Sequence, residues 1–287
     1  MTPDSVSAVV RAGAFIGLFQ SAGIAFFLAI FDGRLGASGA PIRRLGLIAA
    51  AGGIMLVIAH LALEAARMAD EFAGVMDLDL QRLAVRSTNG AAHALQVLGL
   101  LVAAAGLTRP QRSGLVWAVV GSALAILAFA LTGHTSVHPY RWLLAPILLL
   151  HLSIIAFWFG ALAPLFIVTG REALPDAAWI LEKFSTIAAW LVPCILAAGM
   201  AMAFILIPSA AVLRQPYGEL LTAKVLGFVL LLGFAALNKW RLVPALASDP
   251  TRMRASLRHS IAAEYALIIA VLSVTAVLTS FYSPARG

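Results

Sequence analysis

The sequence contains little cysteine and little charge. Cys194 is the single cysteine among 287 residues, which excludes an intramolecular disulfide and any thiolate cluster of the zinc-finger or iron–sulfur kind. Charged residues make up 11% of the chain, whereas about a quarter of an ordinary soluble domain is charged. Any protein ligands for a soft metal must therefore come from histidine and methionine.

The sequence also lacks the common catalytic and nucleotide-binding motifs. It has no glycine-rich phosphate loop, no His-Glu-x-x-His and no Gly-x-Ser-x-Gly. The longest polar stretches, Glu64–Thr88 and Lys239–Arg258, are each about twenty residues long, which is too short for a domain with its own core. The sequence therefore predicts that the protein is not an enzyme, and it excludes an ATP-driven pump.

Long hydrophobic runs fill most of the chain. Hydrophobic residues make up 62% of it and the mean hydropathy is +0.96. A helix needs about twenty apolar residues to cross the hydrocarbon layer, and strands cross it only in closed barrels. We therefore predict an all-α fold, a polytopic transmembrane helix bundle in which residues 1–287 form a single domain and the first run is a retained span. The expected eight spans are Val6–Phe31, Arg44–Leu63, Gly90–Leu107, Gly114–Gly133, Leu143–Thr169, Phe184–Ile207, Leu220–Asn238 and Ser260–Tyr282.

The distribution of basic residues predicts the orientation in the membrane. One set of loops and span ends holds Arg34, Arg43, Arg44, Arg109, Arg112, Arg171, Lys183, Lys239, Arg241, Arg252, Arg254 and Arg258. The opposite set holds fewer basic residues and an acidic cluster, Asp70, Glu71, Asp77 and Asp79. By the positive-inside rule the first set is cytoplasmic, so we expect both termini on the outer, periplasmic side. The formal net charge of +7 then serves topology and contact with the lipid bilayer, and nucleic acid is not expected as a partner.

Histidines fall at matching depths in four of the expected spans. His60, His93, His134 and His151 each lie in the outer half of a different span, and His138 lies in the loop just above. A lone histidine in a membrane helix is more often a hydrogen-bonded packing residue, but four at one level favour a site. The prediction is a metal site formed by His60, His93, His134 and His151, with Glu64 placed one turn beyond His60 either to orient its ring or to hold the charge of a bound cation.

The ligand types narrow the choice of metal. Imidazole suits copper, zinc, iron and nickel, and thioethers suit cuprous ion. Met55, Met200 and Met202 lie at middle to outer depth, although methionine is more often a core residue that fills gaps. Two more ionisable residues, Lys224 and Glu264, lie about one turn inside their spans; either they reach back to the interface or they take part in a charge relay.

The second half of the chain carries a series of segments in a consistent order: Leu131–His134, His151 with Phe157–Leu162, Phe184–Ala188, Gly199, Tyr217–Lys224, Asn238–Pro244 and Glu264. By these segments, about residues 131–284 resemble the copper-resistance D (CopD) family of bacterial inner-membrane proteins. Phe159-Gly160-Ala161 departs from the family, which more often has paired glycines there. The resemblance implies copper transport from periplasm to cytoplasm, with His134 and His151 as copper ligands and Lys224 and Glu264 as functional polar positions.

The expected function is therefore copper binding and transport. The expected cargo is copper as Cu(I), and a periplasmic copper-binding protein is a candidate partner. The main alternative is a membrane protein that binds haem b, with the same histidines as axial ligands and the small residues Ala50, Gly52 and Gly53 beside the porphyrin. A third alternative is a structural or assembly subunit in which the histidines only pack.

Overall fold

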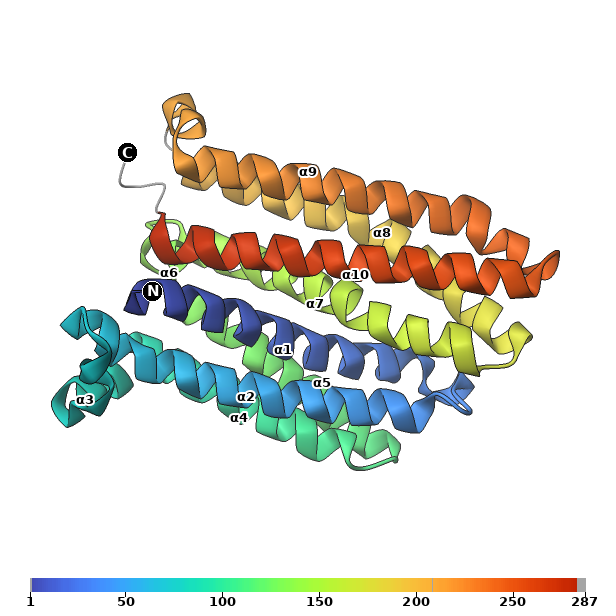
Figure 1. Ribbon diagram of the computed structural model, residues 1–287, viewed down its shortest axis with the longest axis horizontal. Coiled ribbons are helices and arrows are strands. Elements are labelled where there is room, and N and C mark those ends of the chain that lie inside the picture. Colours follow the sequence, from blue (N-terminus) through green and yellow to red (C-terminus); the bar gives the residue numbers. More distant parts are fainter. Residues whose placement is uncertain (1, 208, 283–287) are drawn as a thin grey trace.

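Long helices that lie side by side form the protein (Figure 1). The computed structural model describes residues 2–207 and 209–282, which form helices and the turns between them. In that part of the chain eight helices are long and apolar enough to cross a membrane. The predicted all-α bundle of eight spans is therefore confirmed, and both ends of the described chain lie at the same end of the bundle.

The elements follow the predicted order, with short helices between the long ones. The long helices are α1 (Pro3–Phe31), α2 (Gly39–Ala69), α4 (Thr88–Leu107), α5 (Arg112–Leu127), α7 (Arg141–Arg171), α8 (Leu174–Leu206), α9 (Pro216–Leu237) and α10 (Pro250–Phe281). Between them lie α3 (Leu78–Arg86), α6 (His134–Val137) and the short helical turns Asp32–Arg34, Phe72–Met76, Ala128–Leu131, Ala210–Arg214, Asn238–Leu242 and Pro244–Ala247.

Several helices extend beyond the predicted apolar runs. α8 begins at Leu174 and α10 at Pro250, each ten residues before the predicted start of its span. Both helices have proline in the first turn, where its missing N–H costs nothing, and the α10 N-cap Asp249 accepts a hydrogen bond from the Arg252 N–H at 3.1 Å. The apolar run marks only the part of a helix inside the hydrocarbon, so hydropathy alone placed these starts too late.

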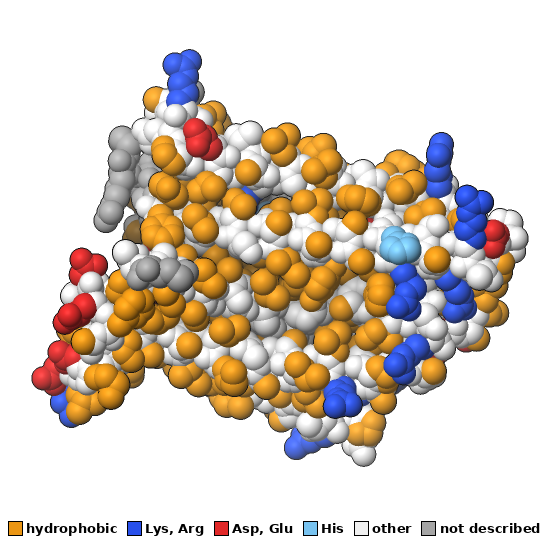
Figure 2. All heavy atoms as spheres, viewed as in Figure 1, with side chains coloured by type: hydrophobic (Ala, Val, Ile, Leu, Met, Phe, Trp, Pro, Cys, Tyr) orange, Lys and Arg blue, Asp and Glu red, His pale blue; other side chains and the backbone are white. Residues whose placement is uncertain are grey.

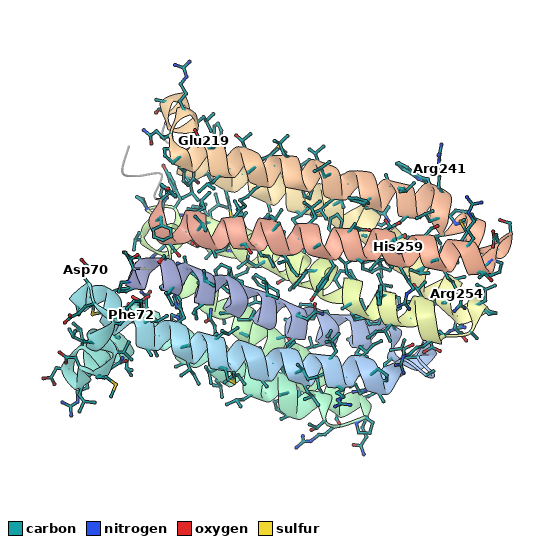
Figure 3. All side chains as sticks on the ribbon, in the orientation of Figure 1. Asp70, Phe72, Glu219, Arg241, Arg254 and His259 are labelled. Atoms are coloured by element: carbon teal, nitrogen blue, oxygen red, sulfur yellow. The ribbon has the colours of Figure 1, made fainter. Side chains whose placement is uncertain are left out.

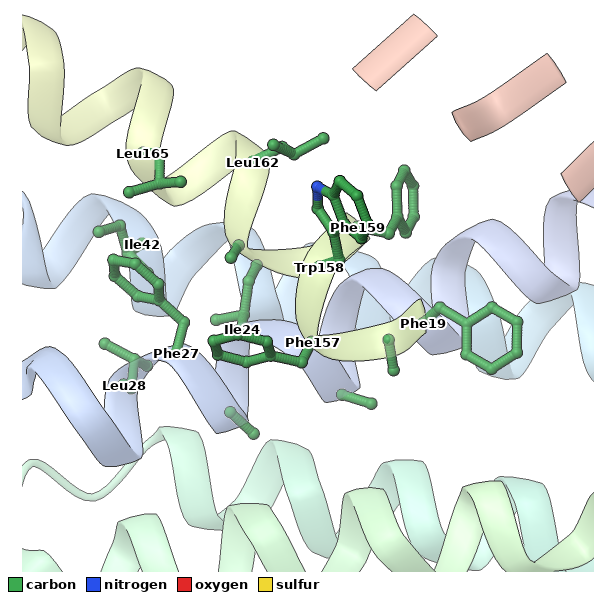
Figure 4. Close-up of a cluster of buried hydrophobic side chains, with 14 of the residues drawn as sticks. Phe19, Ile24, Phe27, Leu28, Ile42, Phe157, Trp158, Phe159, Leu162 and Leu165 are labelled. Carbon is green, nitrogen blue, oxygen red and sulfur yellow. The ribbon is translucent and has the colours of Figure 1, made fainter. Parts of the chain in front are cut away.

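Helix α1 lies at the centre of the bundle. It packs against α2, α4, α5, α7 and α10, and 67% of its apolar window is buried, the largest share of the eight spans. Its side chains Phe19, Ile24, Phe27 and Leu28 belong to a cluster of buried residues shared with α7 (Figure 4). The remaining helices are thus arranged around a core provided largely by α1.

Two glycines allow α1 and α7 to touch. A Cβ atom added to Gly23 would lie 1.9 Å from the carbonyl oxygen of Ala156, and one added to Gly160 would lie 2.4 Å from the Cα of Gly23. Small residues that let two backbones approach are a common basis of helix association in membranes. Gly160 therefore packs against a glycine of another helix, and the fully buried Ala161 replaces the second glycine of the family pattern without loss of this contact.

Two polar side chains in the middle of the bundle, Gln20 and Tyr265, form hydrogen bonds between helices. The side-chain amide of Gln20 donates to the carbonyl oxygen of Gly160 at 3.0 Å, and the hydroxyl of Tyr265 donates to the side-chain oxygen of Gln20 at 2.8 Å. These bonds join α1, α7 and α10 at one level, where unsatisfied polar atoms would cost several kcal/mol.

The two ends of the molecule carry side chains of opposite charge (Figure 2). Lysine and arginine gather at the end where α1 runs into α2, acidic residues gather around α3 at the other end, and hydrophobic side chains cover the surface between. Glu172 lies at the basic end and accepts hydrogen bonds from the N–H groups of Gly36 and Ser38, each at 2.9 Å, and from the Ser38 hydroxyl. Arg254 donates to the carbonyl oxygens of Thr169 and Glu172. Glu172 therefore caps the start of α2 and ties it to α7 and α10.

Replacing Gly23 with alanine should destabilise the bundle, because the added methyl group forces α1 and α7 apart. The expected loss is on the order of 1–3 kcal/mol, the usual cost of overpacking a core. Thermal unfolding of the purified protein in detergent, followed by circular dichroism, measures it. Gly52→Ala is the matched control, since a Cβ there meets nothing within 4 Å; equal stability of the two variants would contradict the close contact.

Acid should weaken the Glu172 cap. Burial raises the pKa of the Glu172 carboxyl, but the hydrogen bonds from Ser38 and Gly36 outweigh this effect and leave the pKa below its ordinary value. A carboxyl with a lowered pKa stabilises the fold above the pKa of the unfolded chain, and this stability is lost as the pH falls through the folded value. Glu172→Gln should therefore cost about 1–3 kcal/mol at neutral pH and lose less stability than wild type below about pH 4.

Unfolding measured from neutral pH down to pH 3 tests this prediction. Glu182→Gln, which alters an exposed carboxyl on α8, is the control and should follow the wild-type curve. A Glu172→Gln protein that keeps the full acid dependence of wild type would show that the cap has no such role.

Candidate metal site

Two of the four predicted histidines meet in the structure. His60 on α2 and His93 on α4 stack with their ring centroids 5.1 Å apart and their planes at 18°. Nδ1 of His60 lies 2.8 Å from Nε2 of His93, which is a hydrogen bond between the two rings. His60 is 6% exposed, whereas His93 is partly exposed, so the pair lies at the edge of the bundle interior.

The hydrogen bonds determine which ring nitrogens carry protons. Nδ1 of His93 lies 2.6 Å from the carbonyl oxygen of Asn89, which can only accept, so this nitrogen carries the proton. In neutral rings Nε2 of His93 is then an acceptor and Nδ1 of His60 is its donor. Nε2 of His60 is left with a lone pair, and it is buried without a hydrogen-bond partner among the described residues. The pair therefore presents one unoccupied imidazole lone pair.

A cavity of about 240 Å³ adjoins the pair. Its polar lining includes Glu64, Asn89, Gln96, Arg11 and Arg67. Arg67 forms ion pairs with Asp4 at 2.6 Å and with Glu64 at 3.2 Å, and Arg11 donates to the carbonyl oxygen of Thr279 at 3.3 Å. Glu64 thus binds Arg67, and the prediction that it orients the His60 ring is wrong; its carboxylate still adds negative charge beside the histidines.

The backbone of His134 follows two residues of the cavity wall. Its side chain lies outside the described part of the structure, so its direction remains a prediction. Thr132 and Gly133, the two residues before it, line the cavity. Gly133 has φ +81°, a left-handed conformation that favours glycine, and it is the N-cap residue of α6. The backbone therefore brings position 134 to the cavity that His60 and His93 line.

His151 lies elsewhere. Its Nδ1 is 3.2 Å from the carbonyl oxygen of Ile195, so the ring packs from α7 against α8. No group of three or more His, Cys, Asp or Glu side chains among the described residues could hold one metal ion. The expected convergence of His151 with His60 and His93 is therefore wrong: equal depth does not fix the direction in which a helix points a side chain.

The methionines do not line this cavity. Met55 and Met200 are 69% and 57% exposed, so they lie on the outer surface of their helices. Sequence reasoning in turn missed Asn89 and Arg11. The spacing of Asn89 and His93, four residues on one helix, was the available signal, because a ring at that position can reach the carbonyl oxygen one turn earlier.

Comparison with known proteins identifies the family. Residues 1–139 match the family model for the copper resistance protein D-like N-terminal domain, and residues 178–278 match the model for copper resistance protein D. The chain belongs to the copper resistance protein D family. The family match thus reaches the first half of the chain, where the sequence resembled the family mainly in hydropathy, and it includes His60, His93 and His134 but not His151.

The chain is also similar in sequence to the copper transport protein CutJ of Bacillus subtilis. It is 31% identical over 164 residues, which are 55% of this chain and 29% of the relative. The matched segment thus spans less than a third of the relative's length. No solved structure matches the chain.

The haem alternative has no support from these comparisons, and the geometry opposes it. Two imidazole nitrogens on opposite sides of one metal ion lie about 4 Å apart at ordinary metal–nitrogen distances, whereas those of His60 and His93 are 2.8 Å apart and hydrogen-bonded. Gly53, expected beside a porphyrin, packs instead against Gly17 of α1.

The proton positions in the histidine pair can be tested by ¹⁵N NMR of protein labelled at histidine. Nε2 of His60 should resonate as an unprotonated nitrogen, and Nδ1 of His93 as a protonated one. Addition of Cu(I) should move the His60 Nε2 signal first. His259→Ala, which removes an exposed histidine of α10, should leave these signals in place. A protonated His60 Nε2 at neutral pH would overturn the assignment.

Proposed function

We propose that this protein transports copper across a bacterial inner membrane, taking Cu(I) from the periplasmic side toward the cytoplasm. Membership of the copper resistance protein D family and the likeness to a copper transport protein support the choice of copper. The observation that carries the proposal is the buried Nε2 of His60, which lies beside a cavity and has no hydrogen-bond partner among the described residues. A neutral imidazole lone pair is a good ligand for copper and a poor one for magnesium or calcium.

In this proposal each histidine has a distinct role. His60 binds copper through Nε2. His93 holds the His60 ring in the required tautomer by accepting its Nδ1 proton, as outer partners of metal-bound histidines commonly do. His134 completes the site from across the cavity. His151 donates Nδ1–H to Ile195, so its Nε2 is free to serve as a separate ligand on the α8 side.

The charges on the cavity wall favour a monovalent cargo. Arg11 and Arg67 line the cavity, and the carboxylates of Asp4 and Glu64 offset Arg67. A divalent ion held by neutral imidazoles would meet stronger repulsion from these guanidinium groups than Cu(I) does. The proposal therefore assigns Cu(I), which neutral nitrogen ligands hold without further negative charge.

The orientation follows from the two ends of the bundle. Asp70 and Phe72 lie at the end that carries the termini, and Arg241 and Arg254 lie at the opposite end (Figure 3). The positive-inside rule assigns the basic end to the cytoplasm. His60 lies nine residues, or about 13 Å along the helix, before the end of α2 at Ala69. The copper site is then reached from the periplasm.

Substitution of the pair should lower copper affinity in graded steps. His60→Ala removes the ligand and should abolish high-affinity Cu(I) binding at this cavity. His93→Ala leaves the ligand but frees its ring, and should weaken binding about tenfold to a hundredfold. Competition of the purified protein with a Cu(I) chelator measures both, and copper uptake into proteoliposomes containing a trapped Cu(I) indicator measures transport.

His259→Ala is the matched control, because this exposed histidine lies near the basic end of the bundle (Figure 3). It should bind and transport copper like wild type. Full copper affinity in His60→Ala would rule out this site, and absence of copper uptake by the wild-type protein in liposomes of either orientation would rule out transport.

A further inference from the structure

A second cavity lies among the last four membrane helices, separate from the one that His60 and His93 line. It measures about 350 Å³ and is lined by residues of α7, α8, α9 and α10. Most of its lining is apolar, for example Trp158, Leu162 and Phe184. Its polar lining consists of Ser185, Asn238, Lys239, Trp240 and Glu264. The carboxyl of Glu264 therefore adjoins a largely apolar space.

Glu264 is placed deep in the bundle. It is 2% exposed, and it lies near the middle of α10 because that helix begins at Pro250. Six residues, or about 9 Å of helix, separate it from Arg258 on the cytoplasmic side. The burial of its side chain shows that the carboxyl faces the interior of the bundle.

The partners of Glu264 are neutral. The side-chain amide of Asn238 donates to it, and Trp158 lies close enough to interact with it. Asn238 opens a π-helical turn, Asn238–Leu242, closed by the hydrogen bond from Val243 N–H to the Asn238 carbonyl oxygen at 2.9 Å. Turns of this kind are rare and often lie at functional sites. The other side-chain atom of Asn238, Oδ1, is buried without a partner in the described part of the chain.

The charged surroundings of Glu264 are sparse. Lys239, in the π-helical turn, is the other charged residue of the described cavity wall, and it forms no ion pair with Glu264 within 4 Å. The wall residues from α7 and α8 carry no ionisable group. Tyr265, next to Glu264, directs its hydroxyl to Gln20 of α1. A carboxylate so placed has no charge partner at close range, which costs several kcal/mol in a low-dielectric site.

We propose that Glu264 is a proton-binding site that the second cavity connects to the cytoplasmic side. A carboxylate oxygen of Glu264 takes a proton from water at that side and becomes a neutral carboxylic acid, whose O–H bonds to the unpartnered Oδ1 of Asn238 after the amide turns. The reverse step returns the proton to water. No other bond forms or breaks.

Coupling to copper follows from the same electrostatics, and this part rests on the proposed function. Either a proton or a nearby monovalent cation neutralises the buried carboxylate, and the two compete. Inward movement of Cu(I) past the cavity therefore displaces the proton that Glu264 took from the cytoplasmic side, and this proton leaves to the periplasmic side, so that one proton exits for each Cu(I) ion that enters.

Infrared difference spectroscopy tests the proton site without copper. Between acid and alkaline pH the wild-type protein should show the carbonyl stretching band of a protonated carboxyl, shifted from that of water-exposed acids. Glu264→Gln should lack this band, and Glu219→Gln, which alters an exposed carboxyl of α9, should keep it. Where Glu264→Gln does not fold, a hydrophobic carbodiimide should label Glu264 of the wild-type protein, mapped by mass spectrometry. A wild-type protein with neither band nor adduct overturns the proposal.

Proton movement driven by copper tests the coupling. Proteoliposomes with a trapped pH indicator should report one proton moved for each Cu(I) ion taken up by wild type. Glu264→Gln should lose the proton signal and keep the Cu(I) affinity of the outer site. An unchanged proton signal in this variant overturns the coupling. Copper uptake that is absent in wild type refutes the transport function, whereas the infrared result still decides the proton site.

Discussion

The close contact of α1 with α7 is the constraint on which the rest of the bundle depends. Gly23 and Gly160 remove the two side chains that would hold these helices apart, and the neighbouring aromatic residues of both helices then interlock. In lipid the hydrophobic effect does not drive helices together, so packing of this kind supplies much of the association energy. α1 in turn supports α2, α4, α5 and α10, and so determines where His60 and Glu264 lie.

The sequence predicted the spans well and the site only in part. Eight apolar runs identify eight membrane helices because the cost of exposing backbone to hydrocarbon leaves no other choice. The depth of each histidine also follows from its place in a run. The direction in which the side chain points around the helix axis does not follow, because an apolar run with weak amphipathicity does not indicate which side of the helix faces the core. For this reason His60 and His93 meet as expected, whereas His151 turns toward α8.

Two other features lay beyond the reach of sequence reasoning. Glu264 seemed to lie near a helix end because the apolar run begins at Ser260, whereas the helix itself begins at Pro250 and places the carboxyl near its middle. The partner of Gly160 was also unpredictable, because Gly23 is far away in the chain and no local pattern connects the two. Contacts between distant helices depend on the assembled bundle, which a reading of one helix at a time does not contain.

The way α8 and α9 are attached has a mechanical consequence. Only 11% of the apolar window of each is buried; α8 packs chiefly on α7 and α9 chiefly on α10. The cavity beside Glu264 lies between these two helices and their neighbours α7 and α10. Rocking of α8 and α9 outward therefore breaks few contacts and leaves the α1 core intact. A change of shape that opens this cavity therefore meets the least resistance at these two helices.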